Sequence, residues 1–353
     1  MTYTVLNRTI RDRGFAAWWR RWSPAPQIAL VGLIAAVIPL LLTEQSLYMK
    51  ILLAAIVVTG LGLFMGYAGQ AALGQGAFVA TGALTVAVFS AQWGLPSWLG
   101  LVAAPVISGL CAALIGWPLL RLRGHYLAFG TLAVLLLVQL AMQSIPLFGA
   151  GQGVVAEPLI DRPDGIRARA WNPILNLVYV YLAVAVLIIV LIMAHRVIAS
   201  RYGRGIRALA GSESAAASSG VPILGSKLKV FVIAAVFAGA AGGITALWYP
   251  YVNQEAFPIA DSFGYVIMAV VGGMTSLWGG VVGAAIIVLL LELLNRIATL
   301  PGVPEVLAHT MQYAGYGLVL VLVLLFMPKG LMPALAAATQ RRRGRGSGHG
   351  SGP

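Results

Sequence analysis

Long apolar runs separated by short polar segments set the pattern of this sequence. A helix needs about 20 mostly apolar residues to cross the ~30 Å hydrocarbon core of a bilayer. Single runs of this kind predict helices at residues 27–43, 47–66, 76–93, 98–120, 126–145, 173–195, 228–249 and 311–326. A longer run, 262–297, contains Gly272-Gly273 and Gly279-Gly280 and is too long for one helix, so it predicts two spans divided near 275–279. The pattern predicts an all-α, polytopic integral membrane protein with about ten transmembrane helices.

Basic residues are concentrated on one side of these predicted spans. If the N-terminus lies inside, the inner segments hold 18 of the 23 Lys and Arg residues. The outer side then holds only Lys50, Arg162, Arg167, Arg169 and Arg296. This bias follows the positive-inside rule and predicts an even number of spans with both termini cytoplasmic. It also supports dividing the longest apolar run, because a single span there would place the basic C-terminus outside.

The composition supports a membrane protein and argues against several other classes. Hydrophobic residues make up 60% of the chain and charged residues only 9%, whereas soluble domains carry about 25% charged residues. The net charge of +13 would suggest nucleic acid in a soluble protein, but here the topology accounts for it, so no nucleic-acid partner is expected. The single cysteine, Cys111, excludes an internal disulfide. The sequence offers neither a nucleophile–base pair nor a metal-ligand cluster, which argues against an enzyme.

The two ends of the chain differ from its apolar centre. Residues 1–26 combine arginines with one phenylalanine and three tryptophans, as expected for a basic helix at the inner membrane interface. A removed signal peptide is not expected, because no small-residue cleavage site follows the first apolar run. Residues 27–330 form the predicted transmembrane domain, and the basic, Gly/Ser-rich residues 331–353 form a predicted disordered tail.

Residues 200–227 form a long, polar and basic segment between two spans. Within it, residues 203–219 have the length of a helix, and Gly220-Val221-Pro222 is expected to end that helix. The arginine-rich start and the small-residue centre suit insertion into a cleft on a partner. The alternative is an amphipathic helix that lies on the membrane surface, but so many Ala, Gly and Ser residues make a poor lipid anchor.

Glycines and amides interrupt several apolar runs and are candidates for a polar pathway through the membrane. Gly69 and Gly74 permit an unwound or re-entrant turn, which a bilayer tolerates only where the turn is buried or lines a cavity. Gln70 and Gln75 would then face a polar solute. The candidate set for the translocation pathway is Gly69, Gln70, Gly74, Gln75, Gln139, Gln143, Gly272 and Gly273. The alternative is close helix packing at the glycines and interhelical hydrogen bonds from the glutamines.

The sequence contains neither an evident proton relay nor an ATP site. Glu292 is the only acid expected inside the membrane, and it precedes Arg296 by four residues near the outer end of its span, where the two side chains can pair. A proton-coupled carrier usually needs a buried carboxylate or histidine relay, and no second member is expected. The nearest approach to a Walker A motif begins at Gly220 but has Ser226 where the lysine should stand. ATP hydrolysis is therefore expected on another polypeptide, and this chain is expected to bind no cofactor.

Several motifs occur together in a characteristic order. They are residues 66–83 (GYAGQAALGQGAFVATGA), 121–133 (RLRGHYLAFGTLA), the polar segment 202–229, and the glycine motifs 238–242 (AGAAG), 271–274 (VGGM) and 279–283 (GGVVG). In this order they resemble the permease subunits of high-affinity branched-chain amino acid ABC transporters, more closely the M-type than the H-type subunit. The resemblance covers roughly residues 45–330.

This resemblance implies a multi-pass permease of the bacterial cytoplasmic (inner) membrane. The implied partners are a second homologous permease subunit, two ABC ATPase subunits that use ATP, an extracytoplasmic solute-binding protein and the lipid bilayer. The resemblance also implies that the 200–227 segment couples to an ATPase through Gly203, Arg204, Arg207, Ala208, Glu213, Ala216, Gly220 and Lys227. The expected function is import of branched-chain or other apolar amino acids by alternating access.

Two departures from the family pattern leave the solute open. Glu213 is the lone acid of the coupling segment, where the family usually has two or three charged residues, so docking is expected to be less ionic. The outer loop 149–172 begins with GAGQG in place of the usual Thr-Gly-Gly, and its mixed charges suit either a transient interface with a binding protein or a plain solvated loop. Urea, short amides and aromatic acids are alternative solutes. An ATP-independent channel or secondary carrier is the alternative from another class.

Overall fold

The computed structural model describes residues 45–122, 124–159 and 173–298, together with the isolated positions 32, 35 and 39. Outside the described residues lie nearly all of the predicted span 27–43, the predicted span 311–326, the segment 1–26, the tail 331–353 and part of the 149–172 loop. In chain order the described elements are α3 (Gln45–Gly62), η1 (Leu63–Tyr67), α4 (Gln75–Ala87), η2 (Val88–Gln92), α5 (Ser97–Leu119), α6 (His125–Ser144), η3 (Pro146–Phe148), β1 (Val154–Val155), α7 (Pro173–Ala199), α8 (Arg201–Gly211), α9 (Glu213–Ser218), α10 (Ile223–Trp248), β2 (Tyr251–Val252), η5 (Gln254–Ala256), α11 (Ile259–Gly272) and α12 (Gly279–Ala298).

Seven helices in the described part of the chain are long and apolar enough to cross a membrane. They coincide with the predicted spans 47–66, 98–120, 126–145, 173–195 and 228–249, and with the two halves of the run 262–297. These predicted spans are confirmed as long apolar helices. The predicted span 76–93 is also helical, as α4 and η2, but it is not among the seven. The total of about ten spans and the cytoplasmic location of both termini remain predictions.

The division of the longest apolar run is confirmed at the predicted glycines. α11 ends at Gly272, and α12 begins at Gly279. Gly273 ends α11 with a φ of 100°, a backbone conformation that glycine adopts more readily than any other residue. A Cβ atom on Gly272 would lie 1.8 Å from the carbonyl oxygen of Gly279. The glycines therefore allow both the turn and the close approach of the two helices.

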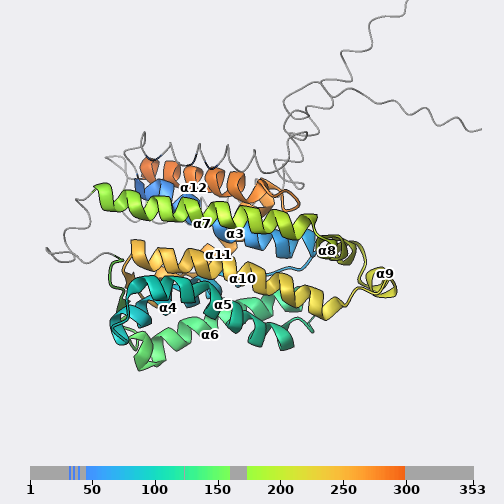
Figure 1. The fold of residues 1–353 in the computed structure, drawn as a ribbon, viewed down its shortest axis with the longest axis horizontal. Coiled ribbons are helices and arrows are strands. Elements are labelled where there is room, and N and C mark those ends of the chain that lie inside the picture. The colour runs from blue at the N-terminus through green and yellow to red at the C-terminus, as the bar shows by residue number, and fades with distance from the viewer. Residues whose placement is uncertain are drawn as a thin grey trace, which may run out of the picture.

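α10 packs against α3, α4 and α5 and lies near the middle of the described bundle (Figure 1). Small residues let α4 approach it closely, since a Cβ atom on Gly82 would lie 2.2 Å from the carbonyl oxygen of Gly239. The ring of Phe231 in α10 also contacts Phe64 and Phe78, with centroid distances of 5.2 and 5.3 Å. These contacts fix α4 against α10 and, with it, the end of the non-helical residues that precede α4.

The connections between helices gather at two opposite ends of the bundle, and α8 and α9 form one of these ends (Figure 1). The other end of α10 leads to β2, which pairs with β1 in a two-stranded antiparallel sheet. The described chain is mostly helical, as predicted, and this small sheet is an addition that the sequence did not predict. Each strand has only two residues, which is too short to produce a recognisable alternation of apolar and polar positions in the sequence.

Candidate functional site

The predicted coupling segment forms two short helices, α8 and α9, instead of one. Ser212 lies between them with an extended backbone. Its side chain accepts a hydrogen bond from the Ala215 N–H, and its own N–H donates to the Ala208 carbonyl, so it closes α8 and caps α9. The prediction of one continuous helix over 203–219 is therefore wrong. The predicted end at Gly220 is confirmed, since this residue has a φ of 78°.

The structure divides the eight predicted coupling residues by their exposure. One group is exposed and consists of Arg204, Arg207, Ala208 and Gly220. The other group consists of Gly203, Ala216 and Lys227, which are buried, and Glu213, which is partly buried. A protein bound at this end can touch the exposed group directly. The covered group instead determines the shape of the segment and its attachment to the bundle.

α8 is held against the bundle by its apolar face and by a partly buried tyrosine. Ile206 and Leu209 are buried on that face. The Tyr202 hydroxyl donates a hydrogen bond to the Ser226 carbonyl at 2.5 Å. Burial raises the pKa of Tyr202 to about 12, although an interaction with the Ser226 side chain opposes this rise. The hydroxyl therefore stays protonated at physiological pH and remains a donor that ties α8 to the first turn of α10.

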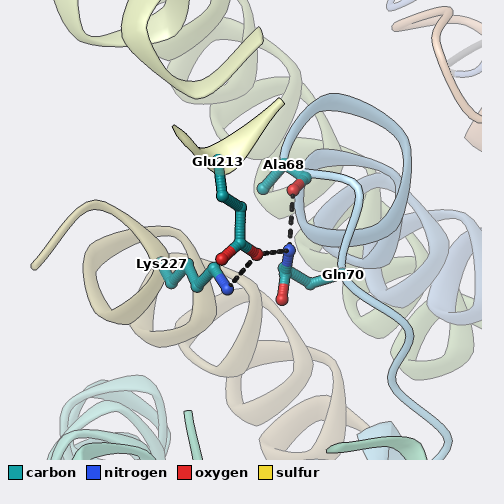
Figure 2. A network of polar contacts seen from close by, with 4 residues as sticks. All are labelled: Ala68, Gln70, Glu213 and Lys227. Atoms are coloured by element: carbon teal, nitrogen blue, oxygen red, sulfur yellow. Dashed lines mark hydrogen bonds and ion pairs between the residues drawn. The ribbon is translucent and has the colours of Figure 1, made fainter. Parts of the chain in front are cut away.

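Glu213 joins the coupling segment to two other parts of the chain (Figure 2). Its carboxylate accepts hydrogen bonds from Lys227 Nζ at 2.5 Å and from Gln70 Nε2 at 3.5 Å. Gln70 Nε2 also donates to the Ala68 carbonyl at 3.2 Å. The Lys227 side chain is only 3% exposed, whereas the Glu213 side chain is 36% exposed. A buried ammonium group needs a counter-charge, and Glu213 supplies one to Lys227 inside the bundle. Gln70, Glu213 and Lys227 are called the Glu213 network below.

The residues between η1 and α4, the 68–74 segment, lie between the coupling helices and the membrane helices. Gly69 has a φ of 66°, and a Cβ atom on it would lie 3.1 Å from the Ala210 Cα in α8. At the other end, a Cβ atom on Gly74 would lie 1.8 Å from the carbonyl oxygen of Thr131 in α6. Because the segment is in tight contact on both sides, a displacement of α8 or α9 cannot leave it unchanged.

The residues 42–327 match the family described as branched-chain amino acid transport system / permease component. This chain belongs to that family. The matched part of this permease includes α8, α9 and the 68–74 segment. It also includes both glycine pairs of the α11–α12 turn. The resemblance drawn from the sequence motifs is thereby confirmed.

Named relatives of this permease occur in bacteria and archaea. The high-affinity branched-chain amino acid transport system permease protein LivM of Salmonella typhimurium is 29% identical over 320 residues, which cover 85% of this chain and 73% of the relative. LivM of Escherichia coli K12 is 29% identical over 329 residues, covering 87% and 75%. A probable LivM protein of Methanocaldococcus jannaschii is 23% identical over 241 residues, covering 67% and 68%. No solved structure matches the chain.

Most of the other candidate pathway residues of the permease make packing contacts in the described bundle. Gln75 and Gln139 each donate a side-chain hydrogen bond of 2.8 Å to a backbone carbonyl of another segment. Gln143 is exposed on α6. Gly272 is the last residue of α11, and Gly273 ends the helix. The contacts of the two hydrogen-bonded amides agree with the packing alternative, and a part for these residues in translocation stays a prediction.

The end of the permease opposite α8 and α9 contains a polar cavity that the sequence did not lead us to expect. The cavity has a volume of about 380 Å³, and its wall includes Lys50, Asp261, Glu292 and Asn295. Glu292 pairs with Arg296 at 3.3 Å, as predicted. The expectation that Glu292 is the only acid inside the membrane stays a prediction, but Asp261 also lies in a helix apolar and long enough to span and lines the same cavity. The sequence held one signal for this cavity, because the charged residues of its wall all lie near the outer ends of predicted spans.

Proposed function

We propose that this chain is one of two permease subunits of an ATP-driven importer for branched-chain amino acids. Its family and the named function of its two bacterial relatives support this proposal. The importer lies in the bacterial cytoplasmic membrane, with α8 and α9 on the cytoplasmic side. A second homologous permease subunit, two ABC ATPase subunits and an extracytoplasmic solute-binding protein complete it. The ATPases bind and hydrolyse ATP, and this chain supplies one half of the path.

The link between α9 and the 68–74 segment is the observation that supports this function best. The exposed side of α8 offers Arg204, Arg207 and Ala208 to an ATPase. The Glu213 network joins α9 to α10 and to the 68–74 segment. A movement of the ATPases that displaces α8 and α9 is therefore passed to a membrane helix and to a non-helical segment between helices. Such a displacement can alternate the access of the path between the two sides.

Docking of an ATPase on α8 can be tested by charge reversal at Arg207. Its guanidinium is exposed and donates one hydrogen bond, at 3.3 Å, to the Ile198 carbonyl near the end of α7. In the Arg207→Glu variant we expect co-purification of the ATPases with the tagged permease to fall by about tenfold or more, because a reversed charge in a docked interface costs several kcal/mol. The measurement is the ratio of ATPase to permease after affinity purification from membranes.

Two further variants separate docking from folding. Arg204→Glu reverses a second exposed charge on α8, and we expect the same loss. Arg121→Glu reverses an exposed charge that follows α5, outside the coupling helices, and we expect normal co-purification. All three variants should elute from gel filtration like the unaltered permease. Normal ATPase recovery with both α8 variants would exclude α8 as the docking helix.

A further inference from the structure

The polar cavity opposite the coupling helices lies where α3, α4, α10, α11 and α12 meet. A second cavity of about 440 Å³ adjoins it, since Thr245, Tyr249, Ala256 and Phe257 line both. Binding sites for small molecules usually have volumes of about 300–1,000 Å³ and combine a mostly apolar wall with a few polar groups. Both cavities fall within this range, and the smaller one also has the expected mixture of groups.

Two opposite charges lie in the smaller cavity and come from different helices. Lys50 is in the second turn of α3, and Asp261 is in the first turn of α11. Both side chains line this one cavity. In the described part of the chain, however, no ion pair or side-chain hydrogen bond is found for either of them. Among the described residues, neither charge is paired, in contrast to Glu292, which pairs with Arg296.

About half of the other wall residues are aliphatic, and the rest are aromatic or polar, among them Tyr265, Glu292 and Asn295. The aliphatic residues include Leu53, Ala54, Val79, Met268, Val288 and Leu291. An aliphatic side chain placed against these residues leaves water without exposing a polar group of the protein. A molecule that carries an ammonium group, a carboxylate and an aliphatic side chain would therefore find a counterpart for each of its three parts in this one cavity.

We propose that this cavity is a binding subsite for the solute, with Asp261 as the partner of the α-ammonium group and Lys50 as the partner of the α-carboxylate. The aliphatic wall receives the side chain of the amino acid. The proposal rests on the proposed function and extends it, because it places a solute site within this one subunit, at the end that receives solute from the binding protein. It also states that recognition requires a zwitterion and not only an aliphatic side chain.

The subsite can be tested by the protection of a cysteine from a membrane-impermeant thiol reagent. Ala256 is exposed and lines both cavities, so Ala256→Cys in a Cys111→Ala background reports on them. Val155→Cys, which is exposed at the same end but lines neither cavity, is the control position. The assembled importer in nanodiscs is labelled with and without L-leucine, N-acetyl-L-leucine or L-leucinamide. The first analogue lacks the ammonium group, and the second lacks the carboxylate.

We expect near-saturating L-leucine to slow labelling at Ala256→Cys by about threefold or more, as occupancy of a site predicts, with no effect at Val155→Cys. Neither analogue should protect the cysteine. Asp261→Asn and Lys50→Gln should each remove the protection while leaving the labelling rate without solute unchanged, which shows that the cavity is intact. Glu157→Gln, which neutralises an exposed carboxylate outside the cavity, should keep the protection.

Absence of protection by L-leucine in the unaltered cavity would overturn the proposal, as would equal protection by all three compounds or full protection in Asp261→Asn. The same nanodisc components, reconstituted in vesicles, are assayed for ATP-dependent uptake of L-leucine. Uptake without protection would overturn the subsite alone and leave the proposed function intact. Failure of every preparation to take up L-leucine would instead count against the proposed function.

Discussion

Replacing Glu213 with alanine is expected to destabilise the permease and to reduce ATP-driven uptake by about tenfold or more. A reduction of this size is within the usual range of energetic coupling between distant sites. The variant removes the carboxylate that lies 2.5 Å from the buried Lys227 ammonium group. Loss of one partner of a fully buried ion pair costs about 3–5 kcal/mol. The Glu213 side chain is 36% exposed, so water screens the pair and we expect about 1–3 kcal/mol. Thermal unfolding of the purified permease and uptake in vesicles measure the two effects.

A second pair of variants separates stability from coupling. Lys227→Met should destabilise less than Glu213→Ala, because the remaining carboxylate is partly exposed and can be hydrated. The double variant Glu213→Gln, Lys227→Met removes both charges and should recover most of the stability. If the Glu213 network passes motion to the 68–74 segment, uptake stays low in the double variant although stability returns. Full uptake in a stable double variant would mean that the ion pair only supports folding.

Replacing Gly242 with alanine is expected to prevent the formation of most folded permease. A Cβ atom on this residue of α10 would lie 1.9 Å from the Val79 carbonyl oxygen in α4. The contact is with backbone and not with the end of a flexible side chain, so α4 must move away from α10. Overpacking in a well-packed interior costs about 1–3 kcal/mol and can cost more where backbone must shift. The fraction of a fluorescently tagged permease that elutes as a single species in gel filtration measures the loss.

The matched control for this variant is Gly225→Ala, in the first turn of the same helix. A Cβ atom on Gly225 would meet no atom within 4 Å. Alanine is favoured over glycine in a helix by roughly 1 kcal/mol, so the control should express as well as the unaltered chain or better. Equal yields from both variants would show that α4 and α10 are not packed as closely as the structure describes.

The sequence predicted the apolar helices well because their length and composition are local properties. The break between α11 and α12 was equally predictable, since Gly272-Gly273 and Gly279-Gly280 interrupt a run that is too long for one span. The break at Ser212 was not, because a serine inside a run of small residues can either continue a helix or cap the next one. Its cap on Ala215 is visible only in the folded chain.

The predicted set of functional residues was incomplete for a different reason. Lys227 was predicted among the coupling residues from its place in the segment, and its burial depends on Glu213 from another helix, which the sequence does not indicate. Asp261 and Lys50 are separated by more than two hundred residues, and the packing of five helices brings them to one cavity. Charges at the outer ends of several predicted spans can be identified in the sequence. Whether they line the same cavity depends on the tertiary structure.

The measurement that tests this account most directly is uptake by vesicles reconstituted with the permease, its partner permease, the ATPases and the binding protein. The components are left out one at a time while internal and external pH are controlled. We expect accumulation of L-leucine only when ATP, both ATPase sites and the binding protein are present, and we expect it to persist when the proton gradient is collapsed. Accumulation without the ATPases, or accumulation driven by an imposed pH gradient alone, would contradict the account and identify a secondary carrier.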